Sequence, residues 1–291
     1  MTLPVSGAIS LGDVNVELQR SATATISMND SELRTLFATT SGAIGLATGY
    51  GKANKFLITI PSNQTNFDLR SYLVANGWNQ TSRAEVTINS GVLIYATTTA
   101  NKGLTVSGSF PNGVQIINNG TIAGHSGNGG GGSNTAGGAG TSGGTALYTT
   151  VPLIVTNNGA IRGGGGGGGG GGGVQRYNAG FTYPGGFWQV AGGAGGKGQN
   201  ATSGNAVGAN GATKVFTSEY GTYLGRITGG KGGTGGTWGS AGSNGAGGAV
   251  TGNWGAGSVH GGGGGGAAGK SVEGNNNITW VVTGTINGSQ T

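Results

Sequence analysis

Residues 163–173 read GGGGGGGGGGG, eleven consecutive glycines. They lie inside a longer stretch, from Gly124 to Gly269, that holds 57 of the chain's 72 glycines. Glycine has no side chain to bury, so this stretch cannot form an ordinary hydrophobic core. It is either a disordered linker or an ordered lattice of backbones that hydrogen-bond to one another.

A single strand of glycines cannot stay ordered by itself, because ordering each residue costs more free energy than one hydrogen bond returns. Ordering one residue costs about 1–2 kcal/mol, with glycine at the upper end, whereas one backbone hydrogen bond returns about 0.5–1.5 kcal/mol net. A bundle can be stable if each residue donates and accepts hydrogen bonds to several neighbouring strands. Polyproline-II geometry suits such a bundle, because its three residues per turn point backbone groups in three directions.

The segments between the glycine runs argue against a linker, because linkers are polar and disordered chains contain few aromatic residues. One insert, residues 174–188, reads VQRYNAGFTYPGGFW, and a second, residues 215–224, reads VFTSEYGTYL. Trp238 and Trp254 interrupt the last runs. Glycine runs that alternate with aromatic inserts predict a repeatedly folded array with loops at its ends.

The aromatic residues of these inserts are the candidate binding residues. Large rings on a rigid scaffold give much contact area for little loss of side-chain entropy, as in antibody paratopes. The alternative is that they cover the ends and sides of the glycine array. The candidate loop with the clearest turn signals runs from Tyr177 to Trp188. The full candidate set is Arg176, Tyr177, Phe181, Tyr183, Phe187, Trp188, Phe216, Tyr220, Tyr223, Trp238 and Trp254.

Charge and composition restrict the partners. The net charge is +6, and from Gly124 onward seven basic residues face only Glu219 and Glu273. This excess either aids solubility or attracts an anionic partner such as lipopolysaccharide, and its scattered charges do not favour nucleic acid. The chain has no cysteine, and its two histidines have no nearby carboxylates, so we expect neither metal nor cofactor. No apolar run reaches 18 residues, and so we expect no membrane insertion.

Two stretches match catalytic motifs, but such matches arise by chance in a chain so rich in glycine. Residues 264–271, GGGAAGKS, fit a P-loop, but the motif requires a preceding strand and a following helix. The residues that follow, Glu273 and then GNNN, start no convincing helix. Gly140–Gly144 mimics a nucleophile elbow, but no aspartate after Asp68 is available to orient a histidine base. We therefore predict that the chain is not an enzyme.

The N-terminal part has a conventional composition. Residues 1–53 contain a near-duplicate, SGAISL at 6–11 and SGAIGL at 41–46, around alternating apolar residues and a short predicted helix that Asn29 or Asp30 caps. Matching flanks around a short helix suggest a compact docking module, or else two similar turns. Residues 54–123 predict a small β-rich domain with a helix capped by Asn66 and a hairpin over 86–95.

A longer repeat connects this domain to the glycine-rich part. Residues 114–124 read VQIINNGTIAG, residues 153–163 read LIVTNNGAIRG, and residues 278–288, ITWVVTGTING, are a degenerate copy. Each copy is an apolar strand, a tight turn, one isoleucine and a glycine exit. We predict that the three strands stack on one another and bring the C-terminus back to the base of the glycine region.

The alternation of glycine runs and aromatic inserts over residues 117–270 resembles the distal tail-fibre adhesins of T-even-like bacteriophages. The resemblance implies a sandwich of polyglycine-II helices whose intervening loops bind the receptor. The first 123 residues, with SGAISLGD at 6–13 and NQTNFDLR at 63–70, are similar to segments of phage tail proteins, which implies attachment to the tail.

We therefore expect a mainly β chain with irregular structure: a tail-docking module (1–53), a β-rich attachment domain (54–123), a polyglycine-II receptor-binding domain (124–270) and a returning strand (271–291). The expected partners are a tail-fibre or tail-tip protein and a bacterial outer-membrane receptor, with lipopolysaccharide second. Since no secretory signal starts the chain, we expect synthesis in the host cytoplasm and a final place in the distal tail of the virion. The alternatives are a virion protein with a glycine-rich spacer and an ice-binding protein.

Overall fold

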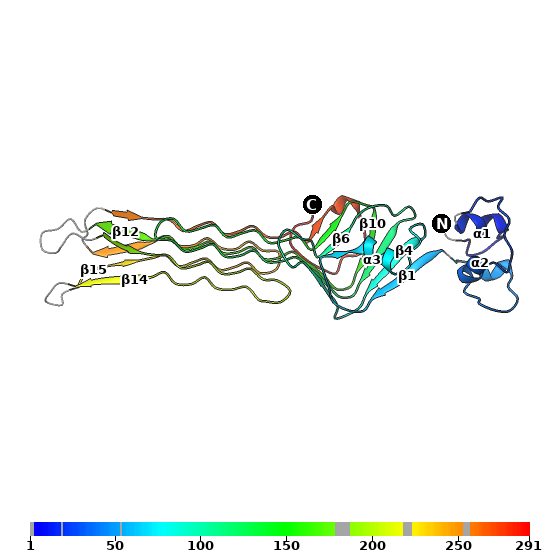
Figure 1. Cartoon of the computed structure of the whole chain (residues 1–291), viewed down its shortest axis with the longest axis horizontal. Helices are drawn as coiled ribbons and strands as arrows, with labels where there is room; N and C mark the ends of the chain where they lie inside the picture. Colours follow the sequence, from blue (N-terminus) through cyan, green and yellow to red (C-terminus); the bar gives the residue numbers. More distant parts are fainter. Residues whose placement is uncertain (1–2, 19, 53, 178–186, 218–222, 253–256) are drawn as a thin grey trace.

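The computed structural model describes residues 3–18, 20–52, 54–177, 187–217, 223–252 and 257–291 of an elongated molecule (Figure 1). A small helical module lies at one end, beside a block of parallel sheets. The glycine-rich segments extend from this block to short hairpins at the opposite end (Figure 1). The chain is mainly β with few helices, as the sequence predicts.

The N-terminal module contains helices α1 (Leu11–Glu17) and α2 (Ser31–Leu36) and the 3-10 helix η1 (Leu46–Gly49). Helix α2 confirms the predicted short helix, with Asp30 at its N-cap position. Helix α1 begins at a capping box in which the side chains of Ser10 and Asp13 accept each other's backbone N–H groups. The apolar core of the module consists of Leu3, Ile9, Val14, Leu33, Leu36 and Phe37.

The sheet block is a three-sided parallel β-helix, in which successive strands lie on successive faces. The first face holds, in order, β1 (Lys55–Ile60), β4 (Arg83–Ile88), β7 (Val114–Asn118), β10 (Leu153–Asn157) and β19 (Ile278–Val282). The second holds β2 (Gln64–Thr65), β5 (Leu93–Tyr95), β8 (Thr121–Ala123), β11 (Ala160–Arg162) and β20 (Thr285–Asn287). The third holds β3 (Phe67–Asp68), β6 (Leu104–Val106), β9 (Leu147–Thr149) and β18 (Val272–Glu273), and the 3-10 helix η2 (Asn275–Asn277) precedes β19.

The predicted hairpin over residues 86–95 is wrong. Strands β4 and β5 lie on different faces, and each pairs in parallel with strands of other turns. The turn signal at 89–91, where Gly91 has φ +78°, marks a corner of the β-helix. A turn motif shows that the chain changes direction, but it does not determine whether the chain folds back or continues onto the next face.

Helix α3 (Leu69–Ala75) confirms the helix predicted after Asn66, but its cap is different. Asp68 is the N-cap residue, and its carboxylate accepts from the N–H of Ser71. Asn66 instead adopts a positive φ of 47° and donates to Thr97 at the next corner. Leu69 and Leu73 of the helix are fully buried in the β-helix core.

The predicted stacking of the three repeats is confirmed. Val114 pairs with Leu153, and Leu153 pairs with Ile278, in neighbouring parallel strands. The asparagines of the repeats form a buried ladder in which the Asn118 side chain donates to Asn157. The C-terminal strands β19 and β20 therefore return to the β-helix, as expected.

The glycine-rich part leaves the β-helix twice at the same corner, between the second and third faces. The first excursion, residues 124–146, lies between β8 and β9, and the second, residues 163–271, lies between β11 and β18. Residues 147–162, which the predicted domain over 124–270 includes, form strands of the β-helix instead. The prediction merged the two excursions into one domain because both are rich in glycine.

The segment of residues 163–173 is enclosed by six others. The N–H groups of residues 164–173 donate in strict rotation, over 2.8–3.0 Å, to the carbonyls of segments 135–144, 193–199 and 240–246. Its carbonyls accept in the same rotation from segments 127–133, 230–239 and 260–269. Each neighbour is thus contacted at every third residue. A seventh segment, 206–212, lies outside, and among the described residues its backbone bonds to segments 191–197 and 229–235 alone.

These contacts exclude side chains from the central segment. A Cβ added to any glycine of residues 163–173 would lie within 3.0 Å of a backbone atom of a neighbour, which real Cβ atoms essentially never do. At Gly131 and Gly261, on the outside, an added Cβ would meet nothing within 4 Å. The unbroken glycine run is therefore required by close packing on every side.

At the far end the chain forms two antiparallel sheets, which together we call the hairpin end (Figure 1). The β12 sheet has the order β13 (Phe187–Val190), β12 (Val174–Tyr177) and β17 (Gly257–Val259). The β15 sheet has the order β14 (Thr213–Thr217), β15 (Tyr223–Thr228) and β16 (Ala249–Gly252).

An ion cluster joins the ends of the two excursions where they re-enter the β-helix. The ammonium of Lys102 lies 2.7 Å from the Glu273 carboxylate and 3.4 Å from the hydroxyl of Thr145. Lys270 lies 3.7 Å from the same carboxylate. The hydrogen bond from Lys102 is the main cause that lowers the pKa of Glu273 below its ordinary value of 4.5.

Substitution Gly168→Ala should destabilise the protein, whereas Gly131→Ala should not. The first places a Cβ against the Gly233 carbonyl inside the bundle, and overpacking of this kind costs about 1–3 kcal/mol. The second meets open space, and it slightly restricts the unfolded chain. Differential scanning calorimetry should show a lower melting temperature for Gly168→Ala only. Equal melting temperatures would contradict the tight central packing.

Substitution Glu273→Gln should lower stability at neutral pH by about 0.5–1 kcal/mol, the range of a partly exposed ion pair. Since the pKa of Glu273 is lowered in the folded state, its contribution is fully present above about pH 4.5 and is lost as the pH falls further. The difference in melting temperature between the two proteins should therefore shrink between pH 5 and pH 3. A difference independent of pH would show that the charge of Glu273 does not stabilise the fold.

Candidate functional site

The hairpin end brings together several of the predicted binding residues. Arg176, Phe187, Trp188 and Phe216 lie on its strands. Tyr177 ends strand β12 and Tyr223 begins strand β15. Phe181, Tyr183, Tyr220 and Trp254 lie outside the described residues.

A small apolar core joins the two sheets of the hairpin end. Val174, Val190 and Ile227 are buried in it, and Trp188, Phe216 and Val250 pack against them. Trp188 and Phe216, predicted as binding residues, are therefore partly used for packing. Their rings meet edge to face, with centroids 5.6 Å apart.

Lys214 packs against two rings of this core, and it was not among the predicted binding residues. Its ammonium lies 3.5 Å from the centroid of the Trp188 ring and 5.8 Å from that of Phe216. The only sequence signal is its position two residues before Phe216, which places both side chains on one face of a strand.

The outward faces of the two sheets carry the exposed groups. Val215, Arg226 and Thr251 are cross-strand partners in the β15 sheet, and all three are exposed. Phe187 of the β12 sheet is 47% exposed and Val215 is 54% exposed. An apolar surface with a neighbouring cation is suited to contact with another macromolecule. Arg226 was not among the predicted residues.

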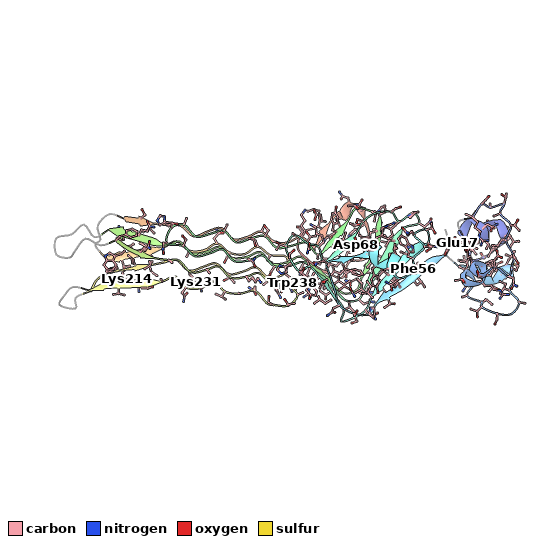
Figure 2. All side chains as sticks on the ribbon, in the orientation of Figure 1. Glu17, Phe56, Asp68, Lys214, Lys231 and Trp238 are labelled. Carbon is pink, nitrogen blue, oxygen red and sulfur yellow. The ribbon has the colours of Figure 1, made fainter. Side chains whose placement is uncertain are left out.

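Trp238 lies at the opposite end of the glycine region from Lys214, next to the β-helix (Figure 2). Its ring lies 5.8 Å from the guanidinium carbon of Arg162, the last residue of β11. Its backbone N–H donates to the side chain of Gln199. These contacts fix the turn of residues 237–240 to the base of the bundle. The structure therefore separates Trp238 from the other described candidates.

The stretch that resembles a P-loop does not have the geometry of a phosphate site. The N–H groups of Gly266 and Gly269 donate to Gly167 and Gly164. The hydroxyl of the buried Ser271 donates to the carbonyl of Gly288. Strand β18 follows where the motif requires a helix. Within the described ranges, no group of three or more His, Cys, Asp or Glu side chains is placed to hold a metal ion.

Comparison with known proteins agrees with this geometry. Residues 55–291 match the family model described as phage tail fibre adhesin Gp38. The chain belongs to this adhesin family. The resemblance noted in the sequence is thereby confirmed, and the adhesin is a component of a phage tail that serves host recognition.

One solved structure with a similar fold is described as the crystal structure of the gp37-gp38 adhesin tip complex of the bacteriophage S16 long tail fiber. The match has a TM-score of 0.50 at 21% sequence identity, and it covers 99% of the adhesin and 100% of that chain. No curated protein matched the sequence. None of the helices that the structure describes is long and apolar enough to cross a membrane.

The positions of Trp238 and Phe187 predict opposite effects of substitution. Trp238→Ala removes the stacking with Arg162 and should cost about 1–2 kcal/mol of stability, while host-cell binding stays within about twofold. Phe187→Ala removes a ring that is 47% exposed and should weaken binding about fivefold or more, with a smaller fall in melting temperature than Trp238→Ala causes. Calorimetry and binding of the labelled protein to host cells measure both quantities. A loss of binding in Trp238→Ala at unchanged stability would contradict this division.

Proposed function

We propose that this adhesin binds a bacterial surface receptor through its hairpin end and attaches to the tail fibre through its N-terminal part. The observation that carries the proposal is that the exposed Phe187, Val215 and Val259 lie on strands at one end of a long ordered bundle. The helical module lies at the other end (Figure 1).

The bundle between them has the properties expected of polyglycine-II helices. A three-residue helix repeats its hydrogen-bonding direction at every third residue, and the central segment rotates its donors among three neighbours with that period. We propose on this basis that the glycine-rich segments of residues 124–146, 163–173, 191–212, 229–248 and 260–271, which lie between the β-helix and the hairpin end, form a polyglycine-II shaft. A shaft held by lateral hydrogen bonds keeps the hairpins in a fixed orientation, so that binding loses little further entropy.

We favour an outer-membrane protein as the receptor class. The exposed side chains of Phe187 and Val215 offer apolar contact area, which a folded protein surface complements better than a phosphate-rich glycolipid does. Lipopolysaccharide is the second choice, since Arg226 and the exposed Lys231 of the shaft give the distal part a positive charge.

The attachment side is proposed from its position and from the similar fold of a chain in a gp37-gp38 tip complex. Residues 1–53 form a separate apolar core and serve as the docking module. The β-helix, which begins with the β-rich region of residues 54–123, connects this module to the shaft. We propose a tail-fibre or tail-tip protein as the partner on this side.

Replacing residues 174–190 by the corresponding insert of another family member should abolish binding to the original host and leave the melting temperature within a few degrees. Among the described residues of this insert, Val174, Trp188 and Val190 belong to the small core of the hairpin end, and none belongs to the core of the β-helix. The measurement is binding of the purified protein to host cells, together with capture of outer-membrane components. Unchanged host binding after the replacement would disprove the assignment of this end.

A further inference from the structure

Lys214 connects two sheets that share no strand pairing in the described part of the chain. Trp188 belongs to β13 of the β12 sheet, whereas Lys214 and Phe216 belong to β14 of the β15 sheet. The ammonium lies 3.5 Å from the Trp188 centroid, and the rings of Trp188 and Phe216 meet at 71°. A cation thus occupies a corner made by aromatic rings of both sheets.

Glycines occupy the neighbouring strand positions: Gly225 pairs with Gly252 and Phe216, and Gly257 pairs with Arg176. These glycines contribute no side chains. The contacts that join the two sheets include the small core around the buried Val174, Val190 and Ile227 and the contact of Lys214 with the rings.

The charge of Lys214 gives this contact a preferred geometry. An ammonium is attracted to the face of an indole by the ring quadrupole, whereas an apolar side chain would only fill the space. Among the described residues, no carboxylate forms an ion pair with Lys214. The Trp188 ring is thus its closest electrostatic partner there.

We infer that Lys214 is a positioning residue for receptor binding. By holding Trp188 it fixes the β12 sheet against the β15 sheet, so that Phe187 on one sheet and Val215 with Arg226 on the other keep one relative position when the hairpin end meets the receptor. The inference rests on the proposed function and adds the residue that unites its two halves. Loss of this contact leaves both surfaces intact but lets them move separately, and binding then has to order them.

The test uses the full chain with Lys214→Met, which keeps the length of the side chain and removes the charge, and Lys214→Arg, which keeps the charge. Lys214→Met should weaken host-cell binding about fivefold to thirtyfold at an unchanged melting temperature, the range that loss of one cation–π contact implies. Lys214→Arg should bind within about threefold of the unaltered protein. Equal binding by Lys214→Met and the unaltered protein would overturn the inference.

A double-mutant cycle with Trp188→Leu separates positioning from direct contact. If Lys214 acts through Trp188, the double variant should bind no more weakly than the weaker single variant. Additive losses would show that Lys214 touches the receptor itself, and they would overturn the inference. The change in tryptophan emission that Lys214→Met causes should also disappear in the Trp188→Leu background, because it originates at that ring.

Two further outcomes are informative. Faster proteolysis of Lys214→Met within the hairpin strands, with no rescue by Lys214→Arg, would indicate a merely structural role and would overturn the inference. If the unaltered chain does not bind host cells, the proposed function fails and the inference fails with it. The emission measurement would still report whether the contact between Lys214 and Trp188 exists.

Discussion

The lateral hydrogen bonds of the glycine region require backbones so close that no Cβ fits between them. Around residues 163–173 this closeness exists on all sides, and every N–H from 164 to 173 reaches a carbonyl of a neighbouring segment. Buried backbone groups that lack partners are costly, so this complete pairing is what makes a region almost without side chains ordered. The backbones can approach this closely only where side chains are absent, so close approach and glycine content are a single constraint.

The same constraint explains why the other glycine runs are uneven. Segment 229–237 has four neighbouring segments and reads GGKGGTGGT, with one outward position in three. Segment 206–212 has only two neighbours and reads AVGANGA, where Gly208 and Gly211 alone face a backbone. From the central segment to these two, the number of glycines in each group of three falls as the number of neighbours falls. Most interruptions by Ala, Ser, Thr and Asn lie on the outside of the lattice, whereas Ser126 is buried and accepts a hydrogen bond from Asn200.

The parts of the structure that follow a local period were predictable from the sequence, and those that depend on distant partners were not. The copies at 114–124 and 153–163 predicted stacked strands, because identical spacing gives identical register. The turn at 89–91 did not reveal that the chain moves to another face. The contact of Trp238 with Arg162 and that of Trp188 with Lys214 join residues far apart in the sequence, and no spacing indicates them.

The glycine lattice alone does not determine its own register. Because the hydrogen bonds to each neighbour recur at every third residue, sliding one glycine segment by three residues restores the same bonds, and the register has to be set at the ends of the segment. At the base, Gly124 donates to Arg162 and Gly163 donates to Asn287, which continues the pairing of β8, β11 and β20 into the shaft. At the far end, the small apolar core of Val174, Val190 and Ile227 fixes the register of the segments that enter the hairpins. Because backbone hydrogen bonds hold the central part of the shaft between them, the outward residues of the hairpins are free to vary without disturbing the scaffold that presents them.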